Sequence, residues 1–166
     1  GTPSYLPPPE LVRVVEAIRT SFHVDPTAEI TLEANPGDFD RGNLATYLDC
    51  GFNRISIGVQ SLDDTLLSML GRRHTADDAI SAFQMASGAG FENVSIDLMY
   101  GLPYQTIEQW ETTLKRALDL GPPHISMYAL TLEGGTPMEQ WVKNGQLPEP
   151  SADLAADMYI KAQGMF

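Results

Sequence analysis

The sequence predicts an α/β fold built around a parallel sheet, and three observations support this. Short apolar runs alternate with helical patterns about every 25 to 40 residues along the chain, as in β-α-β units. Apolar runs such as 96–103 end abruptly in polar or glycine-bearing turns, as buried strands do at the edge of a sheet. Residues 106–120 have the periodicity of an amphipathic helix.

The first half of the chain is predicted to contain two helices and two strands. The prolines at 7–9 lead into a helix that ends before Asp25-Pro26. The apolar face of this helix consists of Leu11, Val14, Val15 and Ile18. A strand over 29–33, a helix around 44–48 that stops at Gly51, and a strand over 54–59 follow.

The second half continues the same alternation. The predicted elements are a short helix ending at Gly71, a helix over 79–89 ending at Gly90, a strand over 94–99, a helix over 106–120, a strand over 125–130, and helices over 138–142 and from 153 onward. Thr106 is expected to cap its helix, with Glu108 and Gln109 placed to reach back to it.

Right-handed crossovers bring the carboxyl ends of parallel strands to one edge of the sheet, so a ligand site is expected there. The residues predicted to share that edge are Gly1 and Thr2, Glu33 and Asn35, Gln60 and Ser61, Asp97 and Tyr100, and Tyr128 and Thr131. Four strands cannot close an eight-stranded barrel. The chain opens on Gly-Thr-Pro without an initiator Met, so we expect it to be part of a longer protein.

The composition narrows the classes of function. With 10 Lys and Arg against 22 Asp and Glu, the net charge is -12, which disfavours nucleic acid and anionic membrane surfaces as partners. No apolar run is long enough for a membrane span, and we expect a cytoplasmic protein. The single Cys50 excludes an internal disulfide, and these residues alone cannot supply the several thiolates of an iron–sulfur site.

Several ordered motifs together carry a family resemblance. They are Gly1 to Leu6, Ile30 to Pro36, Gly51 to Ser61, Leu70 to Thr75 and Asp97 to Pro103. In this order and spacing the chain resembles the radical S-adenosylmethionine (SAM) proteins. Within that group it resembles the oxygen-independent coproporphyrinogen III oxidases and the HemW-type heme chaperones, over essentially all of its length.

The resemblance implies a partial (β/α)6 barrel of the TIM-like, radical SAM type. The chain would form a single core, residues 1–166, from the end of strand 2 to about helix 6. In the family, the first strands and a Cys-x3-Cys-x2-Cys loop precede this point, and that loop holds a 4Fe–4S cluster to which SAM binds. Because the loop is missing from this sequence, we expect the 166 residues alone to be inactive in SAM cleavage.

The resemblance also implies which residues bind the cofactor. Gly1 and Thr2 match a motif along the methionyl part of SAM, and Glu33 matches a position beside the methionine amine. The structural alternatives are an ordinary turn for the first two and, for Glu33, a carboxylate paired with a neighbouring Arg.

Two further groups of residues match other SAM contacts. Gln60, Arg72 and Asp97 match contacts to a second SAM in the oxidase. Tyr128, Ala129 and Thr131 match a further adenosine-side contact, although the local sequence departs from the oxidase pattern there. The structural alternatives are a strand-end amide for Gln60, a surface side chain for Arg72 and a helix-capping role for Asp97. For the group at 128–131 the alternative is packing at the sheet edge.

Other candidate residues are better explained by structure. Gly101 and Pro103 suit a tight strand-to-helix turn without a ligand. His23, His74 and His124 lack metal-ligand spacing, and heme ligation by His74 is the less favoured interpretation. Cys50 is predicted to be a buried thiol.

Two functions remain open for the longer protein. One is a heme chaperone that binds heme and passes it to an acceptor protein. The other is a coproporphyrinogen III oxidase, whose SAM-derived radical begins an oxidative decarboxylation to protoporphyrinogen IX. The segments 71–75 and 120–137 resemble the chaperone branch more closely, so the chaperone is favoured.

Overall fold

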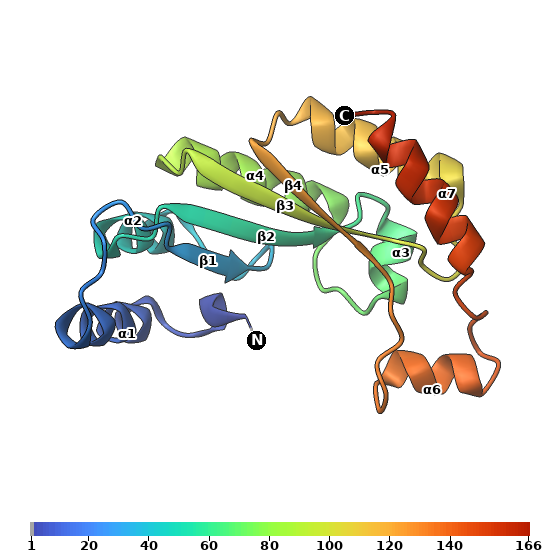
Figure 1. Cartoon of the computed structure of the whole chain (residues 1–166), viewed down its shortest axis with the longest axis horizontal. Helices are drawn as coiled ribbons and strands as arrows, with labels where there is room; N and C mark the ends of the chain where they lie inside the picture. Colours follow the sequence, from blue (N-terminus) through green and yellow to red (C-terminus); the bar gives the residue numbers. More distant parts are fainter. Residues whose placement is uncertain (1) are drawn as a thin grey trace.

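A four-stranded parallel sheet organises the computed structural model, which describes residues 2–166 (Figure 1). In chain order the elements are η1 (Pro3–Tyr5), α1 (Pro8–Ser21), β1 (Thr31–Ala34), α2 (Arg41–Cys50), β2 (Arg54–Gln60), α3 (Asp64–Met69), α4 (Ala76–Ala89), β3 (Asn93–Tyr100), α5 (Ile107–Asp119), β4 (His124–Ala129), α6 (Pro137–Lys143) and α7 (Ala152–Gln163). The predicted alternation of strands and helices is therefore confirmed.

The strands lie in sequence order, β1-β2-β3-β4, and every neighbouring pair is parallel. Glu33 lies opposite Ser56, Ser56 opposite Ser95, and Asp97 opposite Ser126. A register irregularity separates Ile57 from Gln60 at the end of β2. As predicted, all four carboxyl ends meet at one edge of the sheet.

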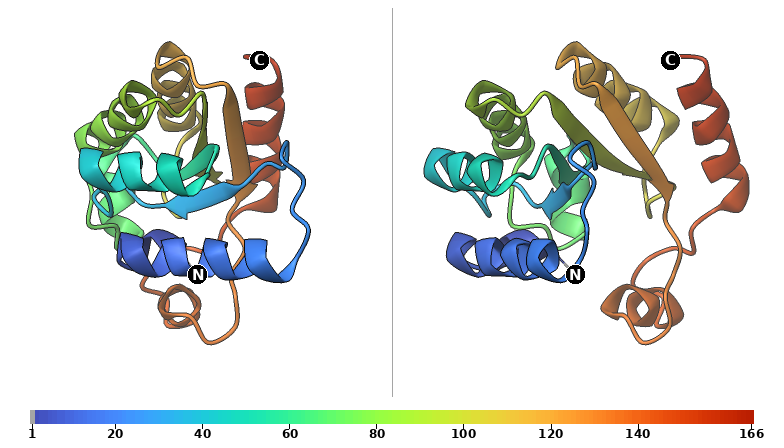
Figure 2. Two further views of the ribbon diagram at one scale, coloured as in Figure 1. Left: turned by 90° about the vertical axis from the view of Figure 1, so that its left-hand side faces the viewer. Right: turned by 60° about the vertical axis from the view of Figure 1, so that its left-hand side comes forward.

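The two faces of the sheet differ in polarity because side chains alternate along each strand. Helices α2, α4 and α5 lie along one face, and the opposite face is not covered by a helix layer (Figure 2). Fully buried apolar side chains fill the helix-covered face: Leu32, Ile55, Ile57, Ile96 and Leu98. The uncovered face carries mostly polar residues, which suits it for a ligand rather than for a core.

Local signals in the sequence explain most helix boundaries. Thr106 caps α5, and the side chain of Gln109 accepts a hydrogen bond from the Thr106 backbone N–H in return. Gly51 and Gly90 end α2 and α4 in the left-handed conformation, as predicted.

The structure corrects the predicted packing of α1. Leu11 and Val15 are buried, but Val14 and Ile18 are 50% and 47% exposed. The helix lies against α2 at the end of the helix layer, so one narrow stripe is covered. The first strand also begins at Thr31 instead of residue 29, because the Ile30 backbone N–H bonds to the side chain of Asn53.

Two C-terminal helices differ in how they pack. Helix α7 lies against α5 and contributes the fully buried Met158, whereas α6 contains no buried residue among the described part of the chain. None of the helices within residues 2–166 is long and apolar enough to cross a membrane.

Candidate functional site

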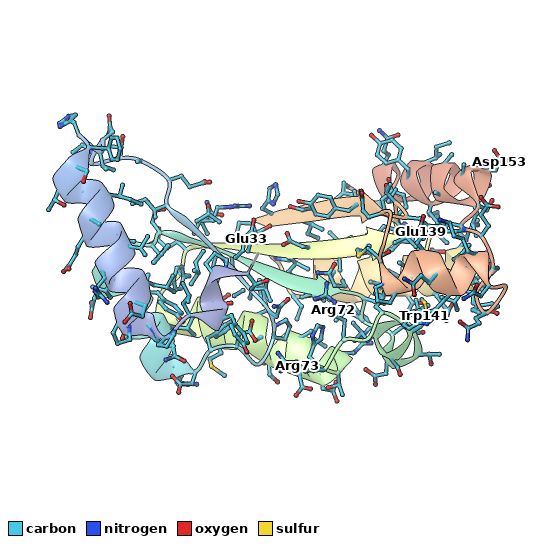
Figure 3. All side chains as sticks on the ribbon, turned by 90° about the horizontal axis from the view of Figure 1, so that it is seen from below. Glu33, Arg72, Arg73, Glu139, Trp141 and Asp153 are labelled. Carbon is cyan, nitrogen blue, oxygen red and sulfur yellow. The ribbon has the colours of Figure 1, made fainter. Side chains whose placement is uncertain are left out.

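The candidate site is the uncovered face of the sheet near the strands' carboxyl ends. The strand register places Glu33, Ser56 and Asp97 on this same face. In Figure 3, Glu33 lies over the middle of the sheet, and Arg72 lies nearer to α6. The structure therefore places Glu33, Ser56 and Asp97 on one face of the sheet, with Glu33 over its middle and Arg72 beyond it toward α6.

Glu33 is the carboxylate on β1, and its side chain is exposed. No Lys or Arg among residues 2–166 forms an ion pair with it, so pairing with a neighbouring Arg is not what holds it. The carboxylate is free to accept hydrogen bonds from a cationic ligand.

Asp97 on β3 is held by its neighbour strand. The Ser56 hydroxyl lies 2.9 and 3.0 Å from the two Asp97 carboxylate oxygens and donates to this carboxylate. Ser56 is buried and Asp97 is half-buried, so the carboxylate is fixed in orientation but still open on one side. An oriented carboxylate of this kind can accept hydrogen bonds from the hydroxyls of a ribose.

Arg72 lies in the loop between α3 and α4, and burial lowers the pKa of its guanidinium. The group stays protonated at neutral pH because a guanidinium loses its proton only far above neutral pH. One of its N–H groups donates to the Asn35 side-chain oxygen at 3.2 Å. A half-buried guanidinium beside an uncovered polar face can bind a carboxylate.

Gln60 ends β2 with a backbone φ of 65°, a conformation that a residue with a side chain seldom adopts. This bend follows the irregular register after Ile57, and Gln60 still pairs with Leu98 at the end of the strand. The Gln60 amide lies near Gly58, which provides the space that the amide needs.

The other residues predicted to contact SAM belong to β4, to the segment after it and to the start of the chain. Tyr128 is 56% exposed and shares the uncovered face through its pairing with Met99, and Ala129 and Thr131 are also exposed. They belong to β4 and its end, across the sheet from β1. Thr2 precedes η1, which contacts β1, while Gly1 lies outside the described residues.

Sequence reasoning assigned no function to Ser4, Asn35, Asp38, Ser56 or Gly58. Asn35 was expected at the edge of the sheet, but nothing in its local sequence indicated a bond to Arg72. Ser56 alternates with buried apolar residues along β2, and that alternation is the one signal that could have placed it on the site face.

Two of the histidines and the single cysteine have structural roles that require no ligand. His74 is buried, its Nε2–H donates to the Val59 carbonyl at 3.1 Å, and burial lowers its pKa. His124 lies at the amino end of β4 with Nδ1 2.8 Å from the Ser95 hydroxyl. Cys50 is buried as predicted, and burial raises its thiol pKa.

Contacts with α7 stabilise the turn that follows β3. Gly101 has a φ of +69°, and its backbone N–H donates to the Met158 sulfur at 3.3 Å. A Cβ on Gly101 would lie 3.1 Å from the Ala155 Cβ. The structural interpretation of Gly101 is therefore sufficient without a ligand.

Comparison with known proteins identifies the family. Residues 1–117 match the radical SAM superfamily, and the chain belongs to that superfamily. The chain is 43% identical over 165 residues to a Bos taurus protein named "Radical S-adenosyl methionine domain-containing protein 1, mitochondrial". It is 40% identical over 163 residues to a Synechocystis protein named "Heme chaperone HemW".

A solved structure shows the same fold. Coproporphyrinogen III oxidase (HemN) from Escherichia coli matches 99% of the chain with a TM-score of 0.86 and 30% sequence identity. The fold is therefore that of the radical SAM proteins, as the sequence predicted. The chain covers 37% of the Bos taurus protein, 40% of the Synechocystis protein and 38% of HemN, so it spans about two fifths of each.

Membership in this superfamily implies SAM and a 4Fe–4S cluster, and the residues present fit the first of these. Glu33 offers an acceptor for an ammonium, Arg72 a partner for a carboxylate and Asp97 an acceptor for hydroxyls. Among residues 2–166 no three His, Cys, Asp or Glu side chains are grouped as metal ligands, and the one cysteine is buried at the end of α2. The described residues thus do not supply the cluster's thiolates.

Proposed function

We propose that the full-length protein is a radical SAM heme chaperone, which binds heme and transfers it to an acceptor protein. The observation that carries this proposal is the 40% identity, across 98% of the chain, to a protein named heme chaperone HemW. The identity to the structurally similar HemN is lower, at 30%.

The second candidate is an oxygen-independent coproporphyrinogen III oxidase. It is favoured by the structural match to HemN, which extends over 99% of the chain. Both candidates would use the same barrel and the same cofactors, so fold alone does not separate them.

SAM is proposed to bind across the uncovered face at the carboxyl ends of the strands. Glu33 accepts from the methionine ammonium, and Gly1 and Thr2 lie along the methionyl part. The carboxylate of Glu33 supports this assignment because it is exposed and forms no ion pair within residues 2–166. When bound to a reduced cluster, SAM supplies a 5′-deoxyadenosyl radical, while this chain binds, orients and shields the cofactor.

A further set of contacts is proposed on the same face. Gln60, Arg72 and Asp97 would bind a second SAM molecule, with the guanidinium on a carboxylate and Asp97 on ribose hydroxyls. The hydrogen bonds that already fix Arg72 and Asp97 support this assignment. Tyr128, Ala129 and Thr131 are proposed to add an adenosine-side contact from β4.

One experiment separates the two functions. The full-length protein, reconstituted with its cluster without oxygen, is incubated with coproporphyrinogen III, SAM and a reductant, and a second sample is titrated with heme. The chaperone proposal predicts stoichiometric heme binding and no protoporphyrinogen. Turnover of coproporphyrinogen III would overturn it in favour of the oxidase.

Location is proposed separately. We propose that the full-length protein is cytoplasmic, and the mitochondrial location in the name of the Bos taurus relative is the alternative. Fractionation of cells followed by immunodetection tests the proposal.

A further inference from the structure

Asn35 occupies a central place beside the candidate site. It follows β1 at the carboxyl edge of the sheet, and its side chain is half-buried between the loop that carries Arg72 and the turn that leads into α2. Figure 3 shows Arg72 close to the sheet and its neighbour Arg73 farther from it. The two successive arginines therefore serve different partners.

The contacts of the Asn35 amide fix its orientation. Its side-chain oxygen accepts from Arg72 at 3.2 Å, and its side-chain nitrogen donates to an Asp38 carboxylate oxygen at 3.0 Å. A guanidinium can only donate and an ionised carboxylate can only accept. The opposite orientation of the amide would lose both bonds, so this orientation is the one that both neighbours require.

Asp38 is itself anchored. Its side chain is 9% exposed and lies 3.8 Å from the Arg73 guanidinium. The same oxygen that accepts from the Asn35 side chain also accepts from the Asn35 backbone N–H at 3.2 Å and from the Ser4 hydroxyl at 3.2 Å. A continuous path of hydrogen bonds therefore runs from Ser4 on η1 through Asp38 and Asn35 to Arg72.

Gly58 leaves space for this arrangement. A Cβ at this position would lie 3.1 Å from the Asn35 side-chain oxygen and 2.8 Å from the Gln60 side-chain nitrogen. The absence of a side chain thus lets two amides approach the strand beside Arg72.

We propose that Asn35 is a positioning residue, which holds the Arg72 guanidinium ready for an anionic group of the bound cofactor. An unrestrained arginine loses side-chain entropy on binding, and prior anchoring through Asn35 and Asp38 reduces that loss. This inference rests on the proposed contact between Arg72 and the second SAM, and it adds a residue that touches no ligand itself.

The test measures the stoichiometry and affinity of radiolabelled SAM on the full-length, cluster-reconstituted protein by equilibrium dialysis, and the affinity compared between variants is that of the second SAM bound. The variants are Asn35→Ala, Arg72→Gln, the double variant, and Asn53→Ala as a matched control. Asn53 also makes two side-chain hydrogen bonds, to the Ile30 N–H at 2.7 Å and the Ala28 carbonyl at 2.9 Å, but at the amino end of β1. It therefore controls for a general loss of side-chain hydrogen bonds.

Asn35→Ala is expected to weaken binding of the second SAM about five- to tenfold, because the unanchored Arg72 side chain would then lose conformational entropy on binding. Arg72→Gln is expected to weaken it at least as much, and the double variant no more than Arg72→Gln alone. Asn53→Ala is expected to leave the affinity unchanged. If Asn35→Ala does not fold, Asn35→Ser is measured in its place with the same expectation.

Three results would overturn the inference, and they are distinguishable. Unchanged affinity in Arg72→Gln removes its premise, the proposed Arg72 contact. Weakened binding in Arg72→Gln but not in the Asn35 variant leaves that contact standing and rejects positioning. An Asn35 effect that persists undiminished in the Arg72→Gln background shows that Asn35 acts by some other route.

Discussion

Gly58→Ala is the perturbation whose effect follows most directly from the structure. Gly58 lies in the buried strand β2, and the new methyl group would meet the Gln60 side-chain nitrogen at 2.8 Å and the Asn35 side-chain oxygen at 3.1 Å. Both atoms belong to side chains that can move, and the Ala34 backbone oxygen is at an ordinary 3.7 Å. The substitution should therefore displace two amides of the site without disrupting the sheet.

The expected magnitudes separate binding from folding. Alanine in a strand gains roughly 0.5–1 kcal/mol over glycine, and an off-rotamer Gln60 costs roughly 0.5–1.5 kcal/mol, so the free energy of unfolding should change by less than about 1 kcal/mol. Disturbing the Asn35 bond to Arg72 and displacing the Gln60 amide should weaken SAM binding by about tenfold or more.

The assay is equilibrium dialysis of SAM together with urea denaturation of the same samples. Gly88→Ala is the matched control, because Gly88 lies in α4 with nothing within 4 Å of its added Cβ. That control should be stabilised by up to about 1 kcal/mol with unchanged SAM affinity. In a folded Gly58→Ala variant, an affinity for the second SAM within twofold of that of the unsubstituted protein would contradict this expectation.

Other predictions concern stability. Met158→Ala removes a fully buried side chain and should lower the free energy of unfolding by about 2–5 kcal/mol. Met158→Leu keeps the side-chain volume but leaves the Gly101 N–H without its acceptor, and it should lower the free energy of unfolding by about 1–3 kcal/mol. Equal losses for the two variants in urea denaturation would contradict this. Burial lowers the pKa of His74 below its ordinary 6.5, so the unfolded chain takes up the proton first and stability should fall as the pH drops below 6.5. His74→Gln should flatten that dependence in denaturation measured from pH 7 to 5, and an unchanged slope would count against it. Thr106→Ala removes the cap of α5 and should cost about 1 kcal/mol in the same assay, with no loss arguing that the cap is dispensable.

The fold could be predicted from the sequence because its signals are local. Apolar runs ending in turns identified all four strands, and Thr106, Gly51 and Gly90 marked helix boundaries through their own conformational preferences. The features that the sequence predicted wrongly depend on tertiary packing. Val14 and Ile18 continue an apolar pattern, but how much of α1 is covered depends on its neighbours.

The site could be predicted in outline only. The topology placed Glu33 and Asp97 at one edge, while the specific assignments to SAM came from resemblance and stay predictions. The contacts that orient the site join residues far apart in the chain: Asn35 and Arg72 are 37 residues apart, and Ser56 and Asp97 are 41 apart. Such pairings depend on strand register and loop geometry, which a single sequence does not specify.

The proposed binding of SAM at the carboxyl end of the uncovered face is open to a direct test. The most direct measurement is calorimetric titration of SAM into the full-length, cluster-reconstituted protein and its Glu33→Ala and Glu29→Ala variants. Glu29 is a carboxylate from the other end of the same sheet, 3.9 Å from Arg54. We expect the first SAM to bind at least about tenfold more weakly to Glu33→Ala and with unchanged affinity to Glu29→Ala. Equal affinity in all three proteins would contradict it.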